Sequence, residues 1–566
     1  MIRNENAAHT VVRAFRRHGV EVAFGQSIPT AFHLVAPSYG IRQIAYRTEN
    51  AGAAMADGYA RIANRVAVVT AQNGPAATLL VPGLAEALKA SVPIVALVQD
   101  VARPTTDRNA FQELDHLELF RGVAKWVRRV AVPERIDDYV DMAFAAAASG
   151  RPGPAVLIVP IDLFRDDSPA ESGRVADLGT FPLDRPAADP AMVAAAADLL
   201  AGAAHPLVVA GGGVHLSGAA DVLAALQERA HLPVGTTSMG KGAVDEEHPL
   251  SLGVIGYFMG RRGMGKFMRP LVDRADVVLL IGNRTNQNGT DSWKLFPRAA
   301  RFIHLDIDGQ EIGRNYEALR LQGDARTTLA ALAAAMGARD LGRRAAARPA
   351  TEAIIAEGRR AHAEEAAPVT GSTATPVRPE RLMAEIDRRL TPDTIVVADA
   401  SYASIWVNNY LRARRPGQRF LTPRGLAGLG WGLPMAIGAR IASPTSPVIC
   451  IAGDGGFAHV WAELETARRM GTPIALTVLN NQILGYQKHA ETVNFGAYTD
   501  AVDFTPVDHA AIARACGCRG VRVEDPAEYG PALDEALAAD LPTVIDVVTD
   551  PDAYPPVTAF DKLRGR

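Results

Sequence analysis

The amino-acid sequence predicts an α/β protein built from three successive domains, each a doubly wound parallel sheet. Its 566 residues correspond to roughly three to four domains of average size. Short uninterrupted apolar runs alternate with helical patterns, which is typical of strands that helices cover on both faces. Two stretches lack this alternation, residues 166–189 and 339–376, and are interpreted as linkers. The expected domains are therefore 1–165, 190–338 and 377–566.

The first block combines helical patterns with apolar runs of strand length. Gly19 is a favourable residue just after a helix, so a helix is expected to end there. The expected helices are Ala7–His18, Glu49–Ile62 and Pro82–Ala90, and the expected strands are Val20–Phe24, Val66–Thr70, Pro93–Val98 and Pro154–Pro160.

The two later blocks repeat this pattern. A helix over His459–Met470 is expected to end at Gly471, and the second linker contains an Ala/Arg/Glu helical segment followed by a loop from Val369 to Pro376. The expected strands are Pro206–Ala210, Val277–Ile281 and Phe302–Ile307 in the second block, and Thr394–Ala398, Pro447–Ala452, Pro473–Leu479 and Thr543–Val548 in the third.

The composition narrows the functional classes. The 59 Lys and Arg residues oppose 62 Asp and Glu, and the net charge of −3 leaves no basic excess for nucleic acid. No run approaches the roughly 20 apolar residues of a membrane span, and the N-terminal segment lacks the apolar core of a signal peptide. Three cysteines are too few for a disulfide framework, and Cys516 and Cys518 lack the second pair that a zinc site needs. We therefore expect a cytoplasmic protein without nucleic-acid or membrane partners.

The most informative motif lies where two strands of the third block end. One strand ends in Gly453-Asp454-Gly455-Gly456, which opens a helix, and the next ends in Asn480-Asn481. Ligands bind beyond the carboxyl ends of parallel strands, and the free amides of a helix start suit a phosphate. Asp454, Asn481 and a backbone carbonyl just past Asn481 would supply oxygen ligands for a magnesium ion. A Gly-Asp-Gly turn alone is common, but its pairing with Asn-Asn favours a phosphate and magnesium site.

With these motifs, the sequence resembles the thiamine-diphosphate enzymes of the acetolactate synthase and pyruvate oxidase/decarboxylase superfamily. The resemblance covers nearly the whole chain, in the family's order of pyrimidine-binding, central and diphosphate-binding domains, and points to proteins like the acetolactate synthase large (catalytic) subunits. It implies thiamine diphosphate and Mg²⁺ as cofactors. By position, Mg²⁺ would be bound by the side chains of Asp454 and Asn481 and the carbonyl of Ile483, and the diphosphate by Gly453, Gly455, Gly456, Phe457, Leu484 and Gly485.

The segment from Tyr46 to Arg61 is similar to the family's cofactor-activating segment. By themselves, Thr48 is a favourable N-cap and Glu49 a carboxylate near a helix N-terminus, which the helix dipole favours. The resemblance implies that Glu49 is the catalytic residue: it would hydrogen-bond N1′ of the aminopyrimidine and so promote proton loss from the thiazolium C2. Burial against the cofactor ring would raise the pKa of this carboxyl.

Two further segments are similar to cofactor-binding loops of the family. In the Gly-rich stretch after Arg424, Leu429 takes the place of the bulky apolar residue that supports the bent cofactor, and Ala427 precedes it. Ala400 and Ser401 follow the expected strand Thr394–Ala398 and match the loop at the diphosphate end. In this family the pyrimidine and diphosphate domains of different subunits meet around one cofactor. We therefore expect a homodimer or homotetramer with the active site at the subunit interface.

The substrate pocket departs from the acetolactate synthase pattern. The loop Gln72-Asn73-Gly74-Pro75 is closer to that of sulfoacetaldehyde acetyltransferase, and His489 stands where biosynthetic members carry a glutamine of their acceptor-shaping segment. Gln112 lies in a Phe-Gln-Glu stretch that acetolactate synthases share. Candidate pocket residues are Gln72, Asn73, Gln112 and His489, each of which has a structural role as its alternative.

The resemblance implies decarboxylation of a 2-oxo acid such as pyruvate and transfer of the acyl-anion equivalent to a carbonyl acceptor. The alternative is another thiamine-dependent lyase, decarboxylase or acetyltransferase, similar to benzoylformate decarboxylase, an aldehyde lyase or sulfoacetaldehyde acetyltransferase. The central turn Gly211-Gly212-Gly213 is a weak dinucleotide fingerprint, so an NAD-dependent oxidoreductase is a remote alternative, as is a non-catalytic binding paralogue. Arg284 matches a family segment that contacts FAD or ADP, and FAD is allowed there without being implied.

Overall fold

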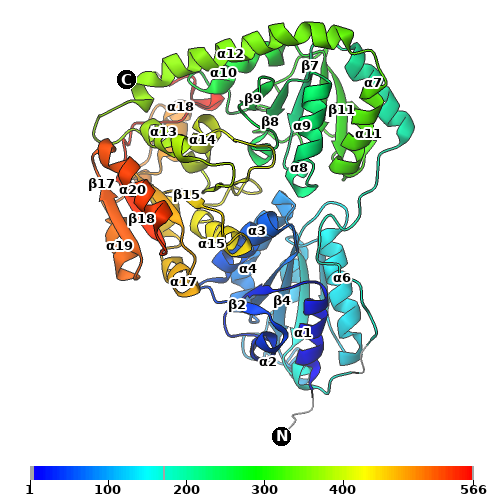
Figure 1. The fold of residues 1–566 in the computed structure, drawn as a ribbon. Helices are drawn as coiled ribbons and strands as arrows, with labels where there is room; N and C mark the ends of the chain where they lie inside the picture. The colour runs from blue at the N-terminus through cyan, green and yellow to red at the C-terminus, as the bar shows by residue number, and fades with distance from the viewer. Residues whose placement is uncertain (1–4, 170–171, 564–566) are drawn as a thin grey trace.

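The computed structural model describes residues 5–169 and 172–563 and consists of three α/β units, each holding one six-stranded parallel sheet (Figure 1). The first unit lies at the bottom of Figure 1. Its strands are β1 (Val22–Phe24), β2 (Arg42–Ile44), β3 (Ala67–Ala71), β4 (Ile94–Asp100), β5 (Trp126–Arg129) and β6 (Ala155–Pro160), and its helices are α1 (Ala7–Arg17), α2 (Thr30–Val35), α3 (Glu49–Ala63), α4 (Pro75–Ala90), α5 (His116–Arg121) and α6 (Ile136–Ala148).

The second unit, green in Figure 1, is also a doubly wound sheet with helices on both faces. Its strands are β7 (Pro206–Ala210), β8 (Val234–Thr236), β9 (Ser251–Val254), β10 (Val277–Ile281), β11 (Arg301–Asp306) and β12 (Ala318–Gln322), and its helices are α7 (Pro190–Gly202), α8 (Gly213–Leu216), α9 (Ala220–Arg229), α10 (Met264–Asp273) and α11 (Ala325–Gly337).

The third unit, yellow to red in Figure 1, lies beside both others. Its strands are β13 (Ile395–Ala398), β14 (Phe420–Leu421), β15 (Val448–Gly453), β16 (Ala475–Asn480), β17 (Arg519–Val523) and β18 (Thr543–Val548), and its helices are α13 (Pro379–Arg389), α14 (Tyr402–Tyr410), α15 (Gly432–Ala442), α16 (Asp454–Ala458), α17 (Glu463–Met470), α18 (Gly485–Phe495), α19 (His509–Ala515) and α20 (Pro526–Ala538).

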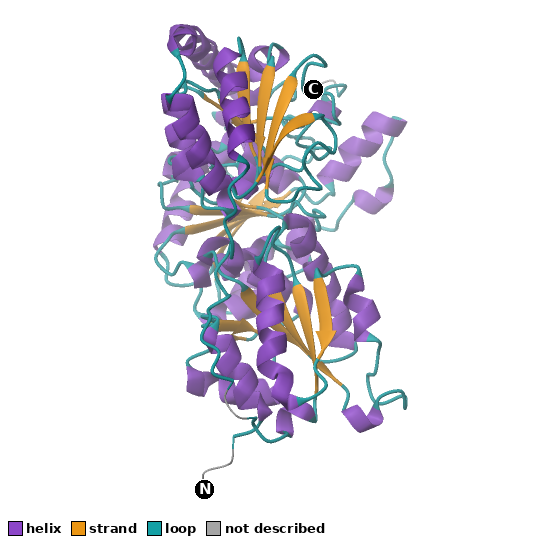
Figure 2. Ribbon diagram, turned by 90° about the vertical axis from the view of Figure 1, so that its right-hand side faces the viewer, coloured by secondary structure: helices purple, strands orange, loops and turns teal. Residues whose placement is uncertain are grey.

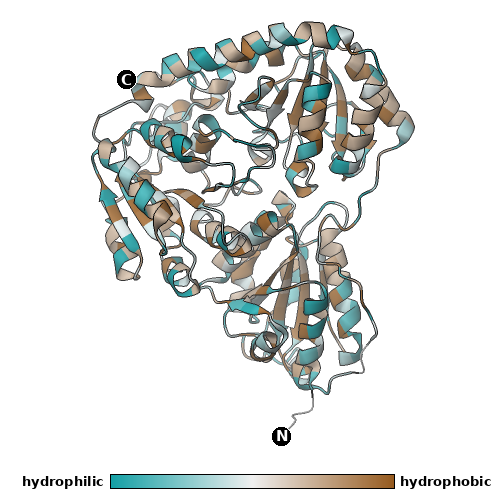
Figure 3. Ribbon diagram, viewed as in Figure 1, coloured by the Kyte–Doolittle hydropathy of each residue, from teal (hydrophilic) through white to brown (hydrophobic). Residues whose placement is uncertain are grey.

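The predicted fold class is confirmed, and the strand orders add a relationship among the units. The first sheet has the order β2-β1-β3-β4-β6-β5, and the third sheet has the same order when its strands are numbered from its own first strand, β14-β13-β15-β16-β18-β17. The second sheet, β12-β11-β10-β7-β8-β9, has the order of doubly wound dinucleotide-binding folds. Figure 2 shows the strands of each sheet enclosed between helices, and Figure 3 shows that the strands carry the hydrophobic residues.

Two expected helices have different bounds in the structure. Helix α4 begins at Pro75, not at Pro82, because Gly74 adopts a positive φ of 64° and Pro75 takes the first helical position; Pro82 lies inside the helix. The helix expected over His459–Met470 begins only at Glu463, as α17, and the short helix α16 ends before it at Ala458. Between α16 and α17 the backbone forms turns in which an amide bonds to the carbonyl three residues earlier. An example is the 3.0 Å bond from the amide of Glu463 to the carbonyl of Val460.

The linkers differ in structure. Helix α12 (Gly342–Thr370) accounts for most of the second linker and runs along the top of Figure 1 from the second unit to the third. The described part of the first linker forms no helix or strand of the sheets, although the amide of Val66 bonds to the carbonyl of Gly179 at 2.7 Å. Among residues 5–169 and 172–563, no helix is long and apolar enough to cross a membrane.

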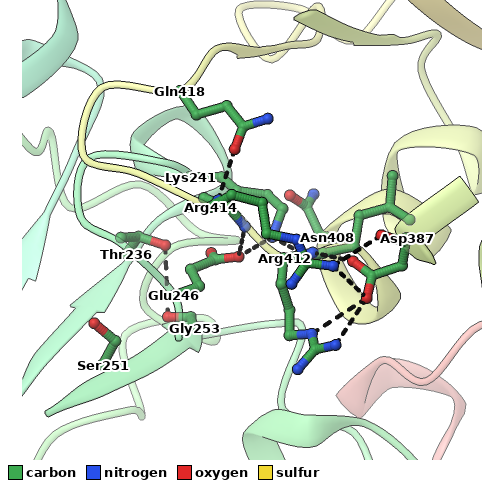
Figure 4. Close-up of polar contacts among 12 residues, drawn as sticks. Thr236, Lys241, Glu246, Ser251, Gly253, Asp387, Asn408, Arg412, Arg414 and Gln418 are labelled. Carbon is green, nitrogen blue, oxygen red and sulfur yellow. Dashed lines mark hydrogen bonds and ion pairs between the residues drawn. The ribbon is translucent and has the colours of Figure 1, made fainter. Parts of the chain in front are cut away.

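A buried polar cluster joins the second unit to the third (Figure 4). Lys241 Nζ donates to Glu246 Oε2 at 2.7 Å and to the carbonyl of Leu411 at 2.6 Å. The same carboxylate accepts the amide of Ala413 at 2.9 Å. Both charged side chains are almost fully buried. Because each is paired and hydrogen-bonded, the cluster fixes the relative placement of the two units without leaving an uncompensated charge.

Candidate active site

A cavity of about 510 Å³ lies beyond the carboxyl ends of strands β13, β15 and β16 of the third sheet. Parallel sheets bind ligands in such crevices, and here the strand order reverses between β13 and β15. The predicted cofactor-binding residues that line this cavity are Ala400, Ser401, Ala427, Leu429, Gly453, Asp454, Gly455, Gly456, Asn481, Ile483, Leu484 and Gly485. Segments up to 85 positions apart in the sequence are therefore brought to one place by the sheet.

Asp454 is the carboxylate at the start of α16. Its Oδ1 accepts the amide of Gly455 at 2.8 Å, and its Oδ2 accepts the amide of Gln482 at 2.6 Å. Burial raises the pKa of Asp454 to about 6, with the two amide bonds acting in the opposite direction. A buried carboxylate without a nearby cationic side chain in its contacts is suited to a metal cation, which would compensate its charge.

The two asparagines at the end of β16 have different roles. Asn480 Nδ2 donates to Asp546 Oδ1 at 2.9 Å and to the carbonyl of Val507 at 3.0 Å, so this residue is structural. Asn481 lines the cavity, and its Oδ1 accepts the amide of Ile483 at 3.3 Å. The carbonyl of Ile483 accepts the amide of Gly485 at 2.8 Å and retains a second lone pair.

The described residues contain no group of three or more His, Cys, Asp or Glu side chains that could hold a metal. The donor set beside Asp454 instead combines one carboxylate with an amide oxygen and a carbonyl. Such a set suits a hard cation that completes its coordination with phosphate oxygens and water. These residues therefore fit a divalent cation shared with a diphosphate.

Asp399, at the end of β13, ties the cavity loops together and was missed as a contact residue by the sequence analysis. This almost fully buried carboxylate accepts the amides of Ala400 at 2.8 Å and of Gly430 and Trp431 at 3.1 Å. A Cβ on Gly456 would lie 2.3 Å from Asp399 Oδ2, so the glycine is required by this close approach. Asp399 thus joins the loop that begins at Ala400 to the C-terminal side of the loop that carries Leu429.

Aromatic side chains and one arginine complete the cavity wall. Tyr257, Tyr402, Trp406, Arg424 and Tyr486 all line it. These residues were not predicted as pocket residues, because the sequence pattern does not reveal that the second unit contributes Tyr257 to this wall.

His489 and Phe457 lie outside the wall of this cavity. His489 stacks against Tyr402, and its Nδ1 lies 2.5 Å from the Tyr402 hydroxyl. Burial lowers the pKa of His489 to about 4, so the ring is neutral at physiological pH. Phe457 is fully buried and packs against His509. The structure therefore places His489 behind the cavity wall and Phe457 in the core below it, although the amide of Phe457 remains part of the α16 N-terminus.

Glu49 begins helix α3 beyond the carboxyl end of β2 in the first unit. Thr48 is the N-cap, as predicted: its hydroxyl accepts the amide of Ala51 at 3.4 Å. Glu49 is largely buried, and burial raises the pKa of its carboxyl. Within one chain Glu49 does not line the cavity that contains Asp454. The two predicted parts of the site therefore do not share that cavity within the single chain.

A buried carboxylate from the third unit holds the backbone that leads into Glu49. Glu463, on α17, accepts the amides of Arg47 and Thr48 at 3.1 Å and the hydroxyl of Thr466 at 2.7 Å. Burial raises the pKa of Glu463. Glu463 therefore fixes the position of the α3 N-terminus from another domain.

The other candidate pocket residues meet at the carboxyl end of β3. Gln72 Nε2 donates to Gln112 Oε1 at 2.6 Å, and Asn73 Nδ2 donates to the carbonyl of Gln112 at 3.0 Å. His116 Nε2 accepts the amide of Gly74 at 3.0 Å. Gln72, Asn73 and Gln112 thus form one cluster in the first unit, whereas His489 lies in the third unit.

A second cavity of about 340 Å³ lies at the carboxyl ends of the central strands. Gly211, Gly213, Arg284 and Asp306 contribute to its wall. A Cβ on Gly211 would lie 2.3 Å from the carbonyl oxygen of Gly282, so this turn passes very close to its neighbour. The strand order reverses between β7 and β10 at this position.

Family models match all three units. The N-terminal thiamine pyrophosphate-binding domain of the thiamine pyrophosphate enzymes matches residues 5–119, their central domain matches residues 193–332, and their C-terminal thiamine pyrophosphate-binding domain matches residues 399–547. The chain belongs to the thiamine-diphosphate-dependent enzymes. The three sheets of the structure correspond to these three family domains.

Full-length relatives of this thiamine-diphosphate enzyme support the assignment. A probable acetolactate synthase large subunit of Methanocaldococcus jannaschii is 32% identical, covering 99% of this chain and 94% of the relative. The acetolactate synthase isozyme 2 large subunit of Escherichia coli is 31% identical, over 96% of each chain. A sulfoacetaldehyde acetyltransferase of Rhodobacter capsulatus is 32% identical, over 93% of this chain and 91% of the relative. The enzyme is thus acetolactate synthase-like, and the relatives include more than one activity.

Proposed function

We propose that this enzyme decarboxylates a 2-oxo acid such as pyruvate, with thiamine diphosphate and Mg²⁺, and transfers the acyl-anion equivalent to a carbonyl acceptor, as an acetolactate synthase does. The observation that carries the proposal is the cavity at the edge of the third sheet. Its wall combines a helix N-terminus, the oxygen donors Asp454 and Asn481, and the apolar Leu429. The acetolactate synthase relatives support the same reaction class.

The proposal assigns a role to each half of the site. The amides at the start of α16 would bind the diphosphate, and Asp454, Asn481 and the Ile483 carbonyl would hold Mg²⁺. Thiamine diphosphate supplies the electron sink for the loss of CO₂. Glu49, whose pKa burial raises, would hold and exchange a proton at its carboxyl oxygen near neutral pH.

The proposal requires a second copy of the chain. Glu49 does not line the cavity that contains Asp454 in the same protomer, so a single chain does not complete the proposed site. We propose that Glu49 of one protomer faces the cavity of its partner in a homodimer or homotetramer.

The reaction is tested by product analysis with purified enzyme, thiamine diphosphate and Mg²⁺. Pyruvate should be consumed with release of CO₂ and formation of a carboligation product. Glu49→Gln removes the exchangeable proton but keeps the shape of the side chain. Its kcat should fall at least about 100-fold, whereas the Kd for thiamine diphosphate, measured by calorimetry, should change little. Full activity of Glu49→Gln would refute the role of this carboxylate.

Metal removal tests the assignment of Asp454. Asp454→Ala should lose most Mg²⁺-dependent retention of thiamine diphosphate, because it removes the carboxylate of the donor set. The measurement is cofactor affinity with Mg²⁺ and with EDTA. In the wild-type enzyme EDTA should weaken binding strongly, and in the variant the two values should converge. Equal Mg²⁺ dependence in both proteins would contradict the assignment.

A second candidate reaction is acetyl transfer to phosphate, as in a sulfoacetaldehyde acetyltransferase. The loop Gln72–Pro75 favours it, together with the relative from Rhodobacter capsulatus. Supplying sulfoacetaldehyde with phosphate separates the two reactions, since only this alternative yields acetyl phosphate from that pair.

We also propose that the second cavity takes a nucleotide such as FAD or ADP. The strand order of the second unit, the close Gly211–Gly213 turn and the placement of Arg284 and Asp306 support it. Absorbance near 450 nm and calorimetry with ADP test this proposal. Absence of binding of either ligand would refute it.

A further inference from the structure

Arg424 lies in the wall between the two cavities. It follows strand β14, and its side chain lines both the cofactor cavity and the second cavity, as do Asn288 and Ala427. Its Cζ lies 5.5 Å from the centroid of the Phe258 ring, and its Nη2 donates to Ser404 Oγ. An aromatic face and a hydroxyl therefore hold the guanidinium in place from the second and third units.

The charge of Arg424 is not compensated by an ion pair within the described residues, and its buried Nε has no hydrogen-bond partner there. Burial lowers the pKa of Arg424 to about 10, so the group remains charged at neutral pH. Glu86, whose charge acts on Arg424, uses its carboxylate to accept the amides of Gly425, Leu426 and Ala427. The Arg424 side chain is half-buried, and its buried Nε lacks a partner in the described residues, so an anionic ligand would complete this site.

Two tyrosine hydroxyls extend the donor set. Tyr257 and Tyr486 line the same cavity as Arg424, and their hydroxyl oxygens are 3.0 Å apart. One hydroxyl donates to the other, which leaves one O–H free to donate to a ligand. Burial raises the pKa of Tyr257, so its hydroxyl stays protonated. A fixed guanidinium beside a phenolic donor suits a carboxylate.

The chemistry of the reaction indicates which carboxylate this is, on the basis of the proposed function. The carboxylate of the donor leaves as CO₂, and a cation bound to it would stabilise the ground state and oppose the reaction. The acceptor keeps its carboxylate throughout, so binding it positions the acceptor without that cost. We propose that Arg424, with the hydroxyl pair of Tyr257 and Tyr486, binds the carboxylate of the acceptor and selects a 2-oxo acid over a neutral aldehyde.

The test is a competition between two acceptors at a fixed concentration of pyruvate. Pyruvate as acceptor gives acetolactate, and added acetaldehyde gives acetoin, so the product ratio reports acceptor choice independently of cofactor loading. Arg424→Gln should lower the acetolactate-to-acetoin ratio about 10- to 100-fold. Arg424→Lys keeps the charge without the planar fork and should give an intermediate ratio. The matched control is Arg344→Gln on helix α12. Arg344 is also an arginine whose pKa burial lowers to about 10 and whose Nε has no hydrogen-bond partner in the described residues, but it lines neither cavity, so its ratio should equal that of the wild type.

An unchanged ratio in Arg424→Gln overturns the proposal, as does an equal fall in Arg344→Gln. A wild-type enzyme that forms neither product contradicts the proposed function instead. Binding then decides the role of Arg424: oxamate and its neutral ethyl ester are titrated by calorimetry into the enzyme with thiamine diphosphate and Mg²⁺. Arg424→Gln should weaken oxamate binding at least tenfold and leave ester binding unchanged. The assignment would be overturned if Arg424→Gln weakened oxamate and ester binding equally, or if it lost only ADP binding.

Discussion

At the residue scale, buried carboxylates have two kinds of role in this enzyme. Glu49 and Asp454 are assigned to the cofactor and the metal, whereas Glu463, Glu86 and Asp399 bind backbone amides of the loops that carry cofactor residues. A carboxylate that accepts hydrogen bonds from several backbone amides fixes the position of a loop and leaves the side-chain face of that loop free. Glu463, Glu86 and Asp399 therefore act through the loops that they hold.

Glu463→Gln tests this positioning role. The amide side chain would direct a donor at the amides of Arg47 or Thr48, so the start of α3 should shift. We expect kcat to fall about 10- to 100-fold, with little change in the Kd for thiamine diphosphate, because the cofactor cavity belongs to the third unit. Steady-state kinetics and calorimetry measure the two quantities. The control is the partly exposed Glu465→Gln, whose ion pair with Arg469 is expected to matter little; parallel losses of kcat and cofactor affinity would argue against positioning.

At the element scale, helices α3 and α15 occupy equivalent places in the first and third units and pack together reciprocally. A Cβ on Gly58 would lie 2.2 Å from the carbonyl oxygen of Met435, and a Cβ on Gly438 would lie 1.9 Å from that of Met55. The helices can approach this closely only because both positions are glycine. Since α3 carries Glu49 and α15 follows the Leu429 loop, this contact sets the spacing of the two half-sites.

Gly58→Ala should destabilise the enzyme by about 1–3 kcal/mol, because the added methyl group would overlap backbone that cannot move freely. Urea unfolding followed by circular dichroism measures the change. Gly337→Ala is the matched control. Gly337 is also a helical glycine, the last residue of α11, and nothing lies within 4 Å of its added Cβ. The control should be neutral or slightly stabilising. Equal unfolding midpoints for the two variants would contradict the packing argument.

At the scale of the whole molecule, the units are joined in different ways. One hydrophobic cluster continues from the first sheet through α3, α4 and α15 into the third sheet, so these two units share a core. The second unit meets the third through Val254 and Phe258, which pack in the core of the third unit, and through the polar contacts that the paired Lys241 and Glu246 make with the backbone of Leu411 and Ala413 (Figure 4). Because the second unit contributes Tyr257 to the wall of the candidate cofactor cavity, its placement shapes that cavity.

Lys241→Met should destabilise the junction by about 3–5 kcal/mol, because it leaves Glu246 as a buried charge without its cation. The double variant with Glu246→Leu should recover part of this loss, since no charge then remains buried. Urea unfolding of the wild type, both single variants and the double variant completes the cycle. Additive losses, with no recovery in the double variant, would indicate that the two side chains act independently.

A site residue can be predicted from the sequence only where neighbouring residues form a recognisable pattern around it. Asp454 and Asn481 follow buried strands at a spacing that implies adjacent strand ends, and the structure places both in one cavity. Asp399 and Glu463 carry no comparable pattern, since a carboxylate that binds distant amides resembles any other in sequence. The start of α4 was misplaced because Pro82 resembles a helix start, whereas the actual start depends on the positive φ of Gly74.

The sequence by itself determined the α/β class, the order of three units and the chemical identity of the groups at the strand ends, because apolar periodicity and turn residues act over a few positions. The tertiary structure decided which groups share a cavity, which carboxylates only hold loops, and that Arg424, Tyr257 and Tyr486 line one wall. Those relations depend on docking between units far apart along the chain, and no local spacing encodes that docking.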